Sequence, residues 1–304
     1  MHIKIGSRKS KLALWQAKHV ANKLINLGHS FELVLMESEG DKILDTPLPL
    51  IGGKGVFTKC LDEAILNNSI DIAVHSCKDI PTELEENLFI AAILERENPT
   101  DALVTKNGID FLAQKHATIA TSSNRRKAQW LSKYPEHTIV DIRGNVPTRI
   151  QKLKNSNWDA TILASAGLIR LELEHEISEE LNWMLSAPAQ GAVAVICNKE
   201  NSVTKEIISQ LNHDKTAKCV HLERDFLNEL SGGCSAPVGA FATIENDTVY
   251  FKGVVLSNDG KEKIEINLEA SSNTSADLGR KAAQIALSKG ALKLIETANH
   301  EKYS

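Results

Sequence analysis

The chain has 304 residues, a formal net charge of −4 and a hydrophobic content of 42%. This length exceeds that of a usual single core, so two or three domains are expected, and the negative charge argues against general nucleic-acid or acidic-membrane binding. No apolar run approaches a membrane span, and no apolar stretch follows the charged start MHIKIGSRKSK, so we expect neither an anchor nor a signal peptide. The five cysteines are odd in number and widely spaced, which is typical of a reducing compartment and indicates no zinc site. We therefore expect a cytoplasmic protein without a metal.

Up to about residue 212 the chain alternates short apolar runs with helical patterns. A strand at 2–6 leads to a helix capped by Ser10, with Ala13, Ala17 and Val20 on one face. Strands are predicted at 31–36, 71–75 and 88–94, and the alternation continues through DALVT, ATIATSS, TIVDIRG and DATILA. This alternation predicts an α/β fold, in which helices cover a largely parallel sheet. Segment 37–57, rich in proline and glycine, fits no regular element; a loop of this length is either a functional lid or disordered, and we favour a lid.

The pattern changes after about residue 214. HDKTAKCVHLERDFLNEL predicts a helix, and PVGAFAT, TVYFKGVVLS and KIEINLEA predict three strands separated by the short breaks ENDT and NDGKEK. Such close spacing favours an antiparallel meander. A last helix is predicted from Ser275 to about Ser288, so we expect a separate α+β unit here.

The stretch LSGGCSAPVG (230–239) holds a lone thiol, Cys234, between two glycines and a Ser-Ala-Pro turn. A free cysteine is often only a small buried hydrophobe. The glycines let the backbone bend sharply or let a bulky group approach. A loop thiol in that setting can also serve as an attachment point, and both interpretations stay open on the residues alone.

Five arginines fall between residues 125 and 170, each beside a break in the pattern: TSSNRR, DIRGNVPTR and AGLIR. Arg8 lies at a similar junction in GSRKS. Ligands of open α/β sheets bind at the carboxyl ends of strands, where these junctions lie, and arginine pairs bidentately with carboxylates. Surface ion pairs are the alternative. No nucleotide motif of the GxxxxGK[ST] or GxGxxG type is present, so a ligand with several carboxylates is favoured.

AVHSCKDIP (73–81) gathers His75, Ser76, Lys78 and Asp79 at the end of a predicted buried strand. A Ser–His dyad is disfavoured because adjacent residues of an extended chain point in opposite directions, and the GxSxG elbow is absent. Asp79 is either a turn or N-cap residue before Pro81, or a fixed carboxylate facing a cation that develops during a reaction.

Taken together and in this order, GSRKSKLALWQ, GGKGVF, DIAVHSCKDIP, TSSNRR, IRGNVPTR, PAQGAVAV and LSGGCSAPVGA resemble the porphobilinogen deaminase family along essentially the whole chain. The resemblance implies a transferase that joins four porphobilinogen molecules head to tail, releases ammonia and yields the linear tetrapyrrole hydroxymethylbilane. It implies a dipyrromethane cofactor attached by a thioether to Cys234, and Asp79 as the catalytic carboxylate at the pyrrole N–H groups. The residues implied to bind cofactor and substrate carboxylates are Arg8, Ser10, Lys78, Ser122, Ser123, Arg125, Arg126, Arg143, Arg149 and Arg170; Lys54, Phe57, Ser76 and Gln190 are expected in the cleft or lid.

The family fold implies two α/β domains resembling periplasmic binding proteins that flank a cleft, plus a C-terminal α+β domain with a three-stranded antiparallel sheet. We expect domain 1 at 1–95 with 190–212, domain 2 at 96–189, and domain 3, with the cofactor cysteine, at 213–304. A monomer that passes its product to uroporphyrinogen-III synthase is expected. The sequence departs from the family pattern at Lys11, Asn124, Pro147 and Asn198. A catalytically silent two-lobed binding protein for a polycarboxylate is the alternative, although such a protein has no need of the GGC loop.

Overall fold

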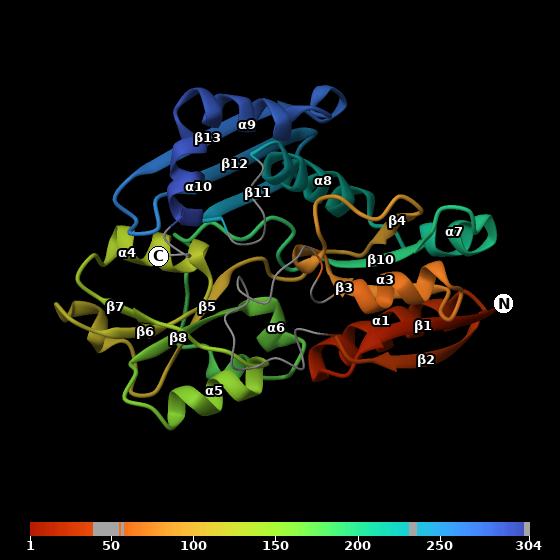
Figure 1. Ribbon diagram of the computed structural model, residues 1–304, viewed down its shortest axis with the longest axis horizontal. Helices are drawn as coiled ribbons and strands as arrows, with labels where there is room; N and C mark the ends of the chain where they lie inside the picture. The colour runs from red at the N-terminus through yellow and green to blue at the C-terminus, as the bar shows by residue number, and fades with distance from the viewer. Residues whose placement is uncertain (39–54, 56–57, 231–235, 301–304) are drawn as a thin grey trace. The chain divides into compact units, whose positions relative to one another are not determined.

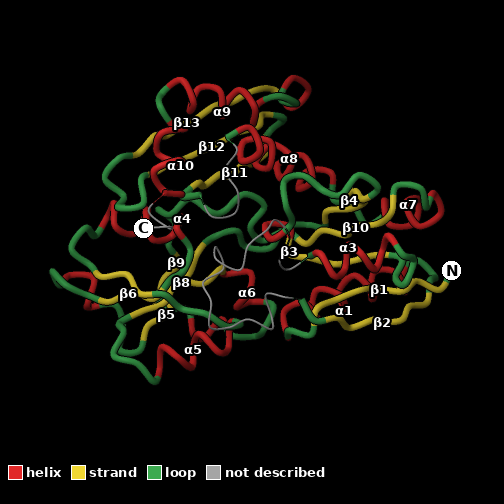
Figure 2. Tube along the Cα trace, viewed as in Figure 1, coloured by secondary structure: helices red, strands yellow, loops and turns green. Residues whose placement is uncertain are grey.

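The computed structural model of the protein describes residues 1–38, 55, 58–230 and 236–300. The chain divides into two compact units, Met1–Glu97 with Gly191–Lys218 and Asn98–Gln190 with Cys219–Ser304. Helices alternate with strands through most of the chain, and a run of three strands follows near the C-terminus (Figures 1 and 2). The expected α/β class with a C-terminal α+β part is confirmed. The division into three domains at the boundaries given above stays a prediction.

The first unit is built on a five-stranded sheet in the order β2-β1-β3-β10-β4. Its strands are β1 (His2–Arg8), β2 (Ser30–Met36), β3 (Ile72–Ser76), β4 (Leu88–Ile93) and β10 (Val193–Asn198). Helices α1 (Lys11–Asn26) and α7 (Ser202–Ser209) pack on one face of this sheet. Helix α3 (Lys59–Leu66) packs on the other face, where a Cβ atom on Gly6 would lie 2.8 Å from the Leu61 side chain. Gly6 therefore permits the close approach of α3 to β1.

A second five-stranded sheet, in the order β7-β6-β8-β5-β9, forms part of the other unit. Its strands are β5 (Asp101–Thr105), β6 (Thr118–Ala120), β7 (Thr138–Val140), β8 (Ala160–Ala164) and β9 (Glu179–Glu180). Trp130 of α4 (Asn124–Lys133) packs on one face. Ile150 of α5 (Val146–Lys154) and Leu168 of α6 (Ser165–Ile169) pack on the opposite face.

The expectation of largely parallel sheets is confirmed for four of the five strands in each sheet, and one strand in each runs the opposite way. In the first sheet β10 runs antiparallel to both β3 and β4, and in the second sheet β5 runs antiparallel to β8 and pairs with β9. The strands β10 and β5 are the first strands after the chain passes from one unit to the other, at 190/191 and 97/98. They do not arrive through a helical crossover of the βαβ type, which is what makes neighbouring strands parallel.

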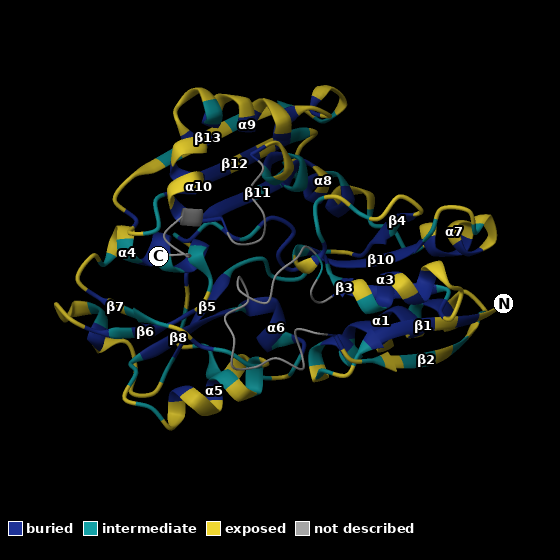
Figure 3. Ribbon diagram, in the orientation of Figure 1, coloured by how far each residue is buried: buried dark blue, intermediate teal, exposed yellow. Residues whose placement is uncertain are grey.

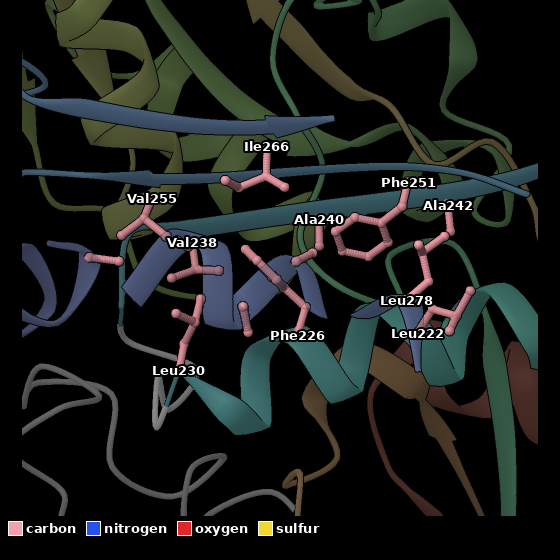
Figure 4. Close-up of a cluster of buried hydrophobic side chains, with 14 of the residues drawn as sticks. Leu222, Phe226, Leu230, Val238, Ala240, Ala242, Phe251, Val255, Ile266 and Leu278 are labelled. Atoms are coloured by element: carbon pink, nitrogen blue, oxygen red, sulfur yellow. The ribbon is translucent and has the colours of Figure 1, made fainter. Parts of the chain in front are cut away.

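The third sheet is the predicted antiparallel meander of β11 (Val238–Glu245), β12 (Thr248–Leu256) and β13 (Lys263–Ser271). Helices α8 (Asp214–Glu229), α9 (Leu278–Ser288) and α10 (Ala291–His300) cover one face. Figure 4 shows Leu222 and Phe226 of α8, and Leu230 directly after this helix, directed toward the strands that carry Ala240 and Phe251. The helix predicted from Ser275 to Ser288 corresponds to α9, and it is followed by α10, which the sequence did not predict.

The opposite face of this sheet contributes Val254 and Leu256 to a small cluster with Ala128 of α4. The two sheets of this unit are therefore joined by apolar packing. Figure 3 shows strands that are largely buried, whereas the outer faces of helices such as α5 and α9 are exposed. This distribution is that of helices covering sheets.

Candidate functional site

In the first unit, the predicted site residues follow the ends of two neighbouring parallel strands. β1 pairs in parallel with β3, with Ile5 opposite Ile72, so the two strands end at the same edge of the sheet. Arg8 is the last residue of β1, and Ser76 is the last residue of β3. A short 3₁₀ turn at Cys77–Asp79 follows and carries Lys78 and Asp79. The structure thus brings Arg8, Ser76, Lys78 and Asp79 to one edge.

The carboxylate of Asp79 is exposed, and it forms neither a hydrogen bond nor an ion pair with any other described residue. It caps no helix, because the 3₁₀ turn begins after Ser76 and its C-cap is Ile80. The interpretation of Asp79 as an N-cap is therefore wrong. A charged side chain without a local structural partner is available to a ligand.

Ser10 caps α1, as its sequence context predicts: its side chain accepts a hydrogen bond from the backbone N–H of Ala13 at 3.3 Å. Lys11, one of the departures from the family pattern, is the first residue of this helix. Nothing in this role excludes a ligand at Ser10, whose hydroxyl has donor capacity left.

Gln16 is a residue at this edge that the sequence did not single out. Its side chain is buried, and its Nε2 donates to the Ser76 hydroxyl at 2.8 Å, which ties α1 to the end of β3. Gln16 lies on the apolar stripe of α1 beside Ala13, Ala17 and Val20. A polar residue on a buried stripe was the signal that could have identified it.

His75 is the second buried polar residue near this edge, with 5% of its surface exposed. Burial, together with the positive charge of Arg8, lowers the pKa of His75 to about 4. Its Nε2 has no hydrogen-bond partner among the described residues. The Ser–His dyad is not formed, since the described partner of the Ser76 hydroxyl is Gln16.

In the second unit, the arginine-rich junctions also gather at one edge. β6 pairs in parallel with β7 and with β8, so the segments that follow these three strands leave the sheet on the same side. Ser122 and Ser123 follow β6, Arg143 follows β7, and Arg170 is the C-cap of α6, the helix after β8. The argument from strand ends that favoured a shared anion site is therefore supported by the topology.

Several of these side chains also have local structural roles. Ser123 caps α4 by accepting from the N–H of Arg126 at 3.4 Å. The Ser122 hydroxyl donates to the carbonyl of Ile142 at 3.0 Å and accepts from its N–H at 2.9 Å, which joins the loops after β6 and β7. Arg149 Nε donates to the carbonyl of Gly144 at 2.7 Å.

Arg125 and Arg126 are almost fully buried, with 5% and 8% of their side chains exposed, and both pair with Asp101, which is completely buried. Arg126 donates from Nε at 2.9 Å and from Nη2 at 2.7 Å to Asp101 Oδ1, and from Nη1 to the carbonyl of Ile162 at 2.8 Å. Arg125 donates from Nη1 to Asp101 Oδ2 at 2.6 Å and to the carbonyl of Leu185 at 2.8 Å.

Desolvation and the neighbouring Arg125 lower the pKa of Arg126, whereas Asp101 opposes that shift. Two guanidinium groups share one carboxylate, so the cluster has an excess of positive charge. An uncompensated buried charge is costly. A bound carboxylate would compensate it, which is the chemistry predicted for this pair.

Comparisons with family models and with curated proteins identify relatives of the chain. Residues 3–236 match the family model "Porphobilinogen deaminase, dipyromethane cofactor binding domain", and residues 217–288 match "Porphobilinogen deaminase, C-terminal domain". The chain belongs to the porphobilinogen deaminase family. It is therefore a transferase of tetrapyrrole synthesis that uses a dipyrromethane cofactor. The resemblance in the sequence motifs is confirmed.

Curated relatives cover almost the whole chain. The porphobilinogen deaminase of a Nitratiruptor species is 41% identical over 98% of this chain and 97% of its own length. That of Desulfitobacterium hafniense is 43% identical over 97% and 96%. Among solved structures, the methionine-binding protein MetQ aligns with 69% of this chain and 89% of its own at a TM-score of 0.43 and 14% identity, a likeness too distant to inform function.

The hydrogen-bond donors found in the chain fit the acidic cofactor of this family. Each pyrrole of a dipyrromethane carries acidic side chains, and Arg125, Arg126, Arg143, Arg149 and Arg170 supply cationic donors around the ends of β6, β7 and β8. Three predicted residues, Lys54, Phe57 and Cys234, lie outside the described residues, as does most of the predicted lid at 37–57.

Gln190 was expected in the cleft or lid. It is the last residue before the chain passes from the second unit to the first, and its side chain binds the segment where the second unit begins. Its Nε2 donates to the carbonyls of Pro99 at 2.8 Å and Thr100 at 3.2 Å, and to Asp101 Oδ1 at 3.0 Å. Gln190 therefore ties the end of one connecting segment to the beginning of β5 and to the arginine cluster.

Asp101 and Glu223 are the other residues that the sequence did not single out. Glu223 of α8 is fully buried and accepts from the backbone N–H groups of Ala189 at 2.7 Å and Ala242 at 2.8 Å. Asp101 opens a buried strand, and Glu223 lies between apolar residues of a helix. An acidic residue inside an apolar pattern was the available signal, because buried charges are almost always paired.

The remaining departures from the family pattern are accommodated locally. Pro147 lies in the first turn of α5, where proline is tolerated, and Asn145 caps that helix by accepting from Thr148 N–H. Asn124 begins α4, and Asn198 Oδ1 accepts from Glu200 N–H in the turn after β10.

Within the described part of the chain, no cluster of histidine, cysteine or acidic residues is arranged to bind a metal. In the same part, no helix has the length and apolar character needed to cross a membrane.

Proposed function

We propose that the chain condenses four porphobilinogen molecules head to tail, releases one ammonia per addition and yields hydroxymethylbilane. The observation that carries this proposal beyond family membership is the buried Arg125–Arg126 pair, which has a single acidic partner in Asp101 among the described residues and thus an excess positive charge suited to carboxylates. Each porphobilinogen adds two carboxylates to the growing product, so several arginines are needed as the chain lengthens.

When bound, the dipyrromethane supplies the terminal pyrrole on which the product grows. The residues that would hold it are Cys234, by a thioether, and the arginines at the ends of β6, β7 and β8. A cysteine thiolate is a suitable nucleophile for such an attachment. Ser123 adds a hydroxyl beside the arginines, whereas the O–H of Ser122 already donates to the carbonyl of Ile142. In the first unit, Arg8 and Lys78 are cationic residues at the edge where β1 and β3 end.

Asp79 is proposed as the catalytic carboxylate. Its charge has no described protein partner, so it is available to accept a hydrogen bond from the N–H of a substrate pyrrole. A fixed negative charge there stabilises the positive charge that spreads over the ring as ammonia leaves. Gln16 supports this arrangement because it holds Ser76, three residues before Asp79.

Intact mass tests the attachment directly. Purified protein should exceed the sequence mass by two pyrrole units and should give a colour with acidic Ehrlich reagent, whereas Cys234→Ala should show neither and should be inactive. Cys60→Ser is the matched control, because Cys60 is a half-buried cysteine elsewhere in the chain that forms no disulfide. An increment that persists in Cys234→Ala would contradict the assignment.

A catalytically silent polycarboxylate-binding protein would show no ammonia release from porphobilinogen in the same preparation. The monomeric state, the cytoplasmic location and the transfer of product to a uroporphyrinogen-III synthase are part of the proposal. Gel filtration tests the first of these.

A further inference from the structure

Arg143, one of the predicted carboxylate ligands, lies in the short connection between β7 and α5. Residues 141–144 of this connection, which we call the Arg143 loop, form neither helix nor strand. The parallel pairing of β6 with β7 ends at Ala120 and Val140, and the N–H of Thr121 then donates to the carbonyl of Val140 at 2.8 Å. Beyond this point the two chain segments are joined by a side chain.

That side chain is Ser122, whose hydroxyl bonds both main-chain groups of one residue. It donates to the carbonyl of Ile142 at 3.0 Å and accepts from the N–H of Ile142 at 2.9 Å. Ile142 is only 2% exposed, so water has little access to these groups, and buried main-chain groups that lose their partner are costly. The Ser122 hydroxyl thus extends the link between the two strands into the Arg143 loop.

The same hydrogen bonds limit what Ser122 can offer to a ligand. A hydroxyl has one proton to donate, and the proton of Ser122 goes to the carbonyl of Ile142. A ligand carboxylate can only accept hydrogen bonds. In this arrangement Ser122 therefore has no proton left for a carboxylate, in contrast to Arg143, whose guanidinium carries five N–H groups.

Two side chains of α5 hold the loop from the opposite side. Lys152 Nζ donates to the carbonyl of Arg143 at 3.0 Å, and Arg149 Nε donates to that of Gly144 at 2.7 Å. Gly144 has a φ of +120°, and a Cβ atom there would lie 2.7 Å from the Thr148 side chain, so glycine permits this turn into α5. The Arg143 loop is therefore fixed both to the segment after β6 and to α5.

We propose that Ser122 is a positioning residue: it fixes the Arg143 loop so that the Arg143 side chain meets a carboxylate of the cofactor or of the growing product, and it does not bind that carboxylate itself. Lys152, which the sequence did not single out, is its counterpart on α5. This inference rests on the proposed function, and it replaces the direct binding that the family resemblance implies for Ser122. Loss of either contact should widen the range of positions open to Arg143.

The first set of variants tests Ser122. Ser122→Ala removes both hydrogen bonds to Ile142, whereas Ser122→Thr keeps a hydroxyl there. Ser156→Ala is the matched control. The Ser156 hydroxyl also donates to a carbonyl, that of Leu153 at 2.9 Å, and accepts from an N–H, that of Trp158 at 3.2 Å, but it does so in the turn after α5. Its removal costs the same kinds of hydrogen bond without touching the loop.

Hydrogen exchange reports the state of the loop without any contribution from activity. It is measured on the full chain with Cys234→Ala, to which no cofactor is attached. The Ile142 amide should exchange about tenfold faster or more in Ser122→Ala, because its acceptor is gone, and at the parent rate in Ser122→Thr and Ser156→Ala. Unchanged exchange in Ser122→Ala would overturn the proposal.

Steady-state kinetics of the same substitutions in the chain that keeps Cys234 report the effect on Arg143. The carboxylates of porphobilinogen do not react, so a misplaced ligand for them weakens the binding of substrate and transition state alike. We expect KM to rise about three- to tenfold in Ser122→Ala, kcat to stay within about twofold, and Ser122→Thr to restore KM. A fall in kcat at unchanged KM would reduce Ser122 to a structural residue.

Lys152→Met separates positioning from a direct contact of Ser122 with the ligand. It keeps most of the aliphatic stem and removes the ammonium group that holds the carbonyl of Arg143. Lys154→Met is the control, because Lys154 is an exposed lysine of the same helix whose partner is Glu176. KM should rise about two- to fivefold in Lys152→Met alone, and equal KM values in the two variants would contradict the role of Lys152.

Failure of the proposed function gives a different result. A wild-type protein without the mass increment or without turnover would contradict that function, whereas the exchange rate of Ile142 in the cofactor-free chain tests the hold of Ser122 on the loop in either case.

Discussion

Glu223→Gln is the substitution for which the structure gives the clearest estimate of its cost. The carboxylate is fully buried, and each of its oxygens accepts one backbone N–H, from Ala189 and from Ala242. A glutamine side chain has one carbonyl oxygen, so it keeps only one of these hydrogen bonds, and its amide N–H₂ then faces the other N–H.

The loss has two parts. The retained hydrogen bond becomes neutral, and the second is replaced by a buried donor without an acceptor, which costs about 1–3 kcal/mol by itself. We therefore expect the free energy of unfolding to fall by about 2–4 kcal/mol. For a unit of this size that corresponds to a fall in melting temperature of roughly 5–15 °C.

Calorimetry of Glu223→Gln and of Glu229→Gln measures the effect. Glu229 is the matched control because it lies on the same helix and is exposed, and surface substitutions usually change stability by no more than about 0.5 kcal/mol. A loss of about 1 kcal/mol in the free energy of unfolding would lower the melting temperature by about 2 °C or more. If Glu223→Gln, like Glu229→Gln, melts within about 2 °C of the wild type, then Glu223 does not hold the Ala189 turn, and the reasoning from its two hydrogen bonds is refuted.

Three further outcomes are expected. Asp79→Asn should melt like the wild type, since its carboxylate has no described partner, but should lose about 100- to 1000-fold in turnover; near-normal turnover in a porphobilinogen assay would make Asp79 a structural residue. Burial and Arg8 lower the pKa of His75 from 6.5 to about 4, so the unfolded chain binds this proton more tightly and stability is lost as pH falls from about 6.5 to 4; urea unfolding should show about 3 kcal/mol less stability at pH 4 than at pH 7 from this group, a difference that His75→Gln removes. Gly279→Ala should strongly destabilise the packing of α9 on α8, because the new Cβ would overlap the carbonyl oxygen of Leu222 and lie 2.8 Å from its carbonyl carbon; an unchanged melting temperature would show that the helices can separate without cost.

Local patterns in the sequence predicted most of the individual elements. The C-terminal meander was predicted because ENDT and NDGKEK interrupt three apolar runs at the spacing of hairpins, and the strands β11, β12 and β13 pair in that order. The Ser10 cap was predicted for a similar reason, since capping depends on residues within one turn. These features are decided by neighbours in the chain.

Pairing direction depends on distant residues, and the sequence did not predict that one strand of each sheet, β10 or β5, runs against the others. VAVICN of β10 has the pattern of a buried strand whichever way it runs, because an apolar run has no direction. Its antiparallel place between β3 and β4 follows from where the chain returns to the first unit, at Gly191. The position of β5 in the other sheet has the same origin.

The candidate site was predicted in part. The strand-end argument correctly brought the junctions after β6, β7 and β8 to one edge. It did not predict that Arg125 and Arg126 turn toward a buried acid, since Asp101 lies more than twenty residues away in the sequence and belongs to another strand. The family resemblance alone supplied the role of Cys234, which lies outside the described residues.

Gln16, Asp101 and Glu223 have the same structural role, although their contacts differ. Each interrupts an apolar pattern, each is buried, and each bonds to a segment distant in sequence: Ser76, Arg125 and Ala189 respectively. A buried polar group without a partner would cost free energy, so the partner must be held in place whenever the fold forms. Each pair therefore fixes a segment at a proposed functional residue: Gln16 fixes Ser76 ahead of Asp79, Asp101 fixes Arg125, and Glu223 fixes Ala189 ahead of Gln190. In this chain, a polar residue inside an apolar stripe therefore indicates a segment that carries a proposed functional residue.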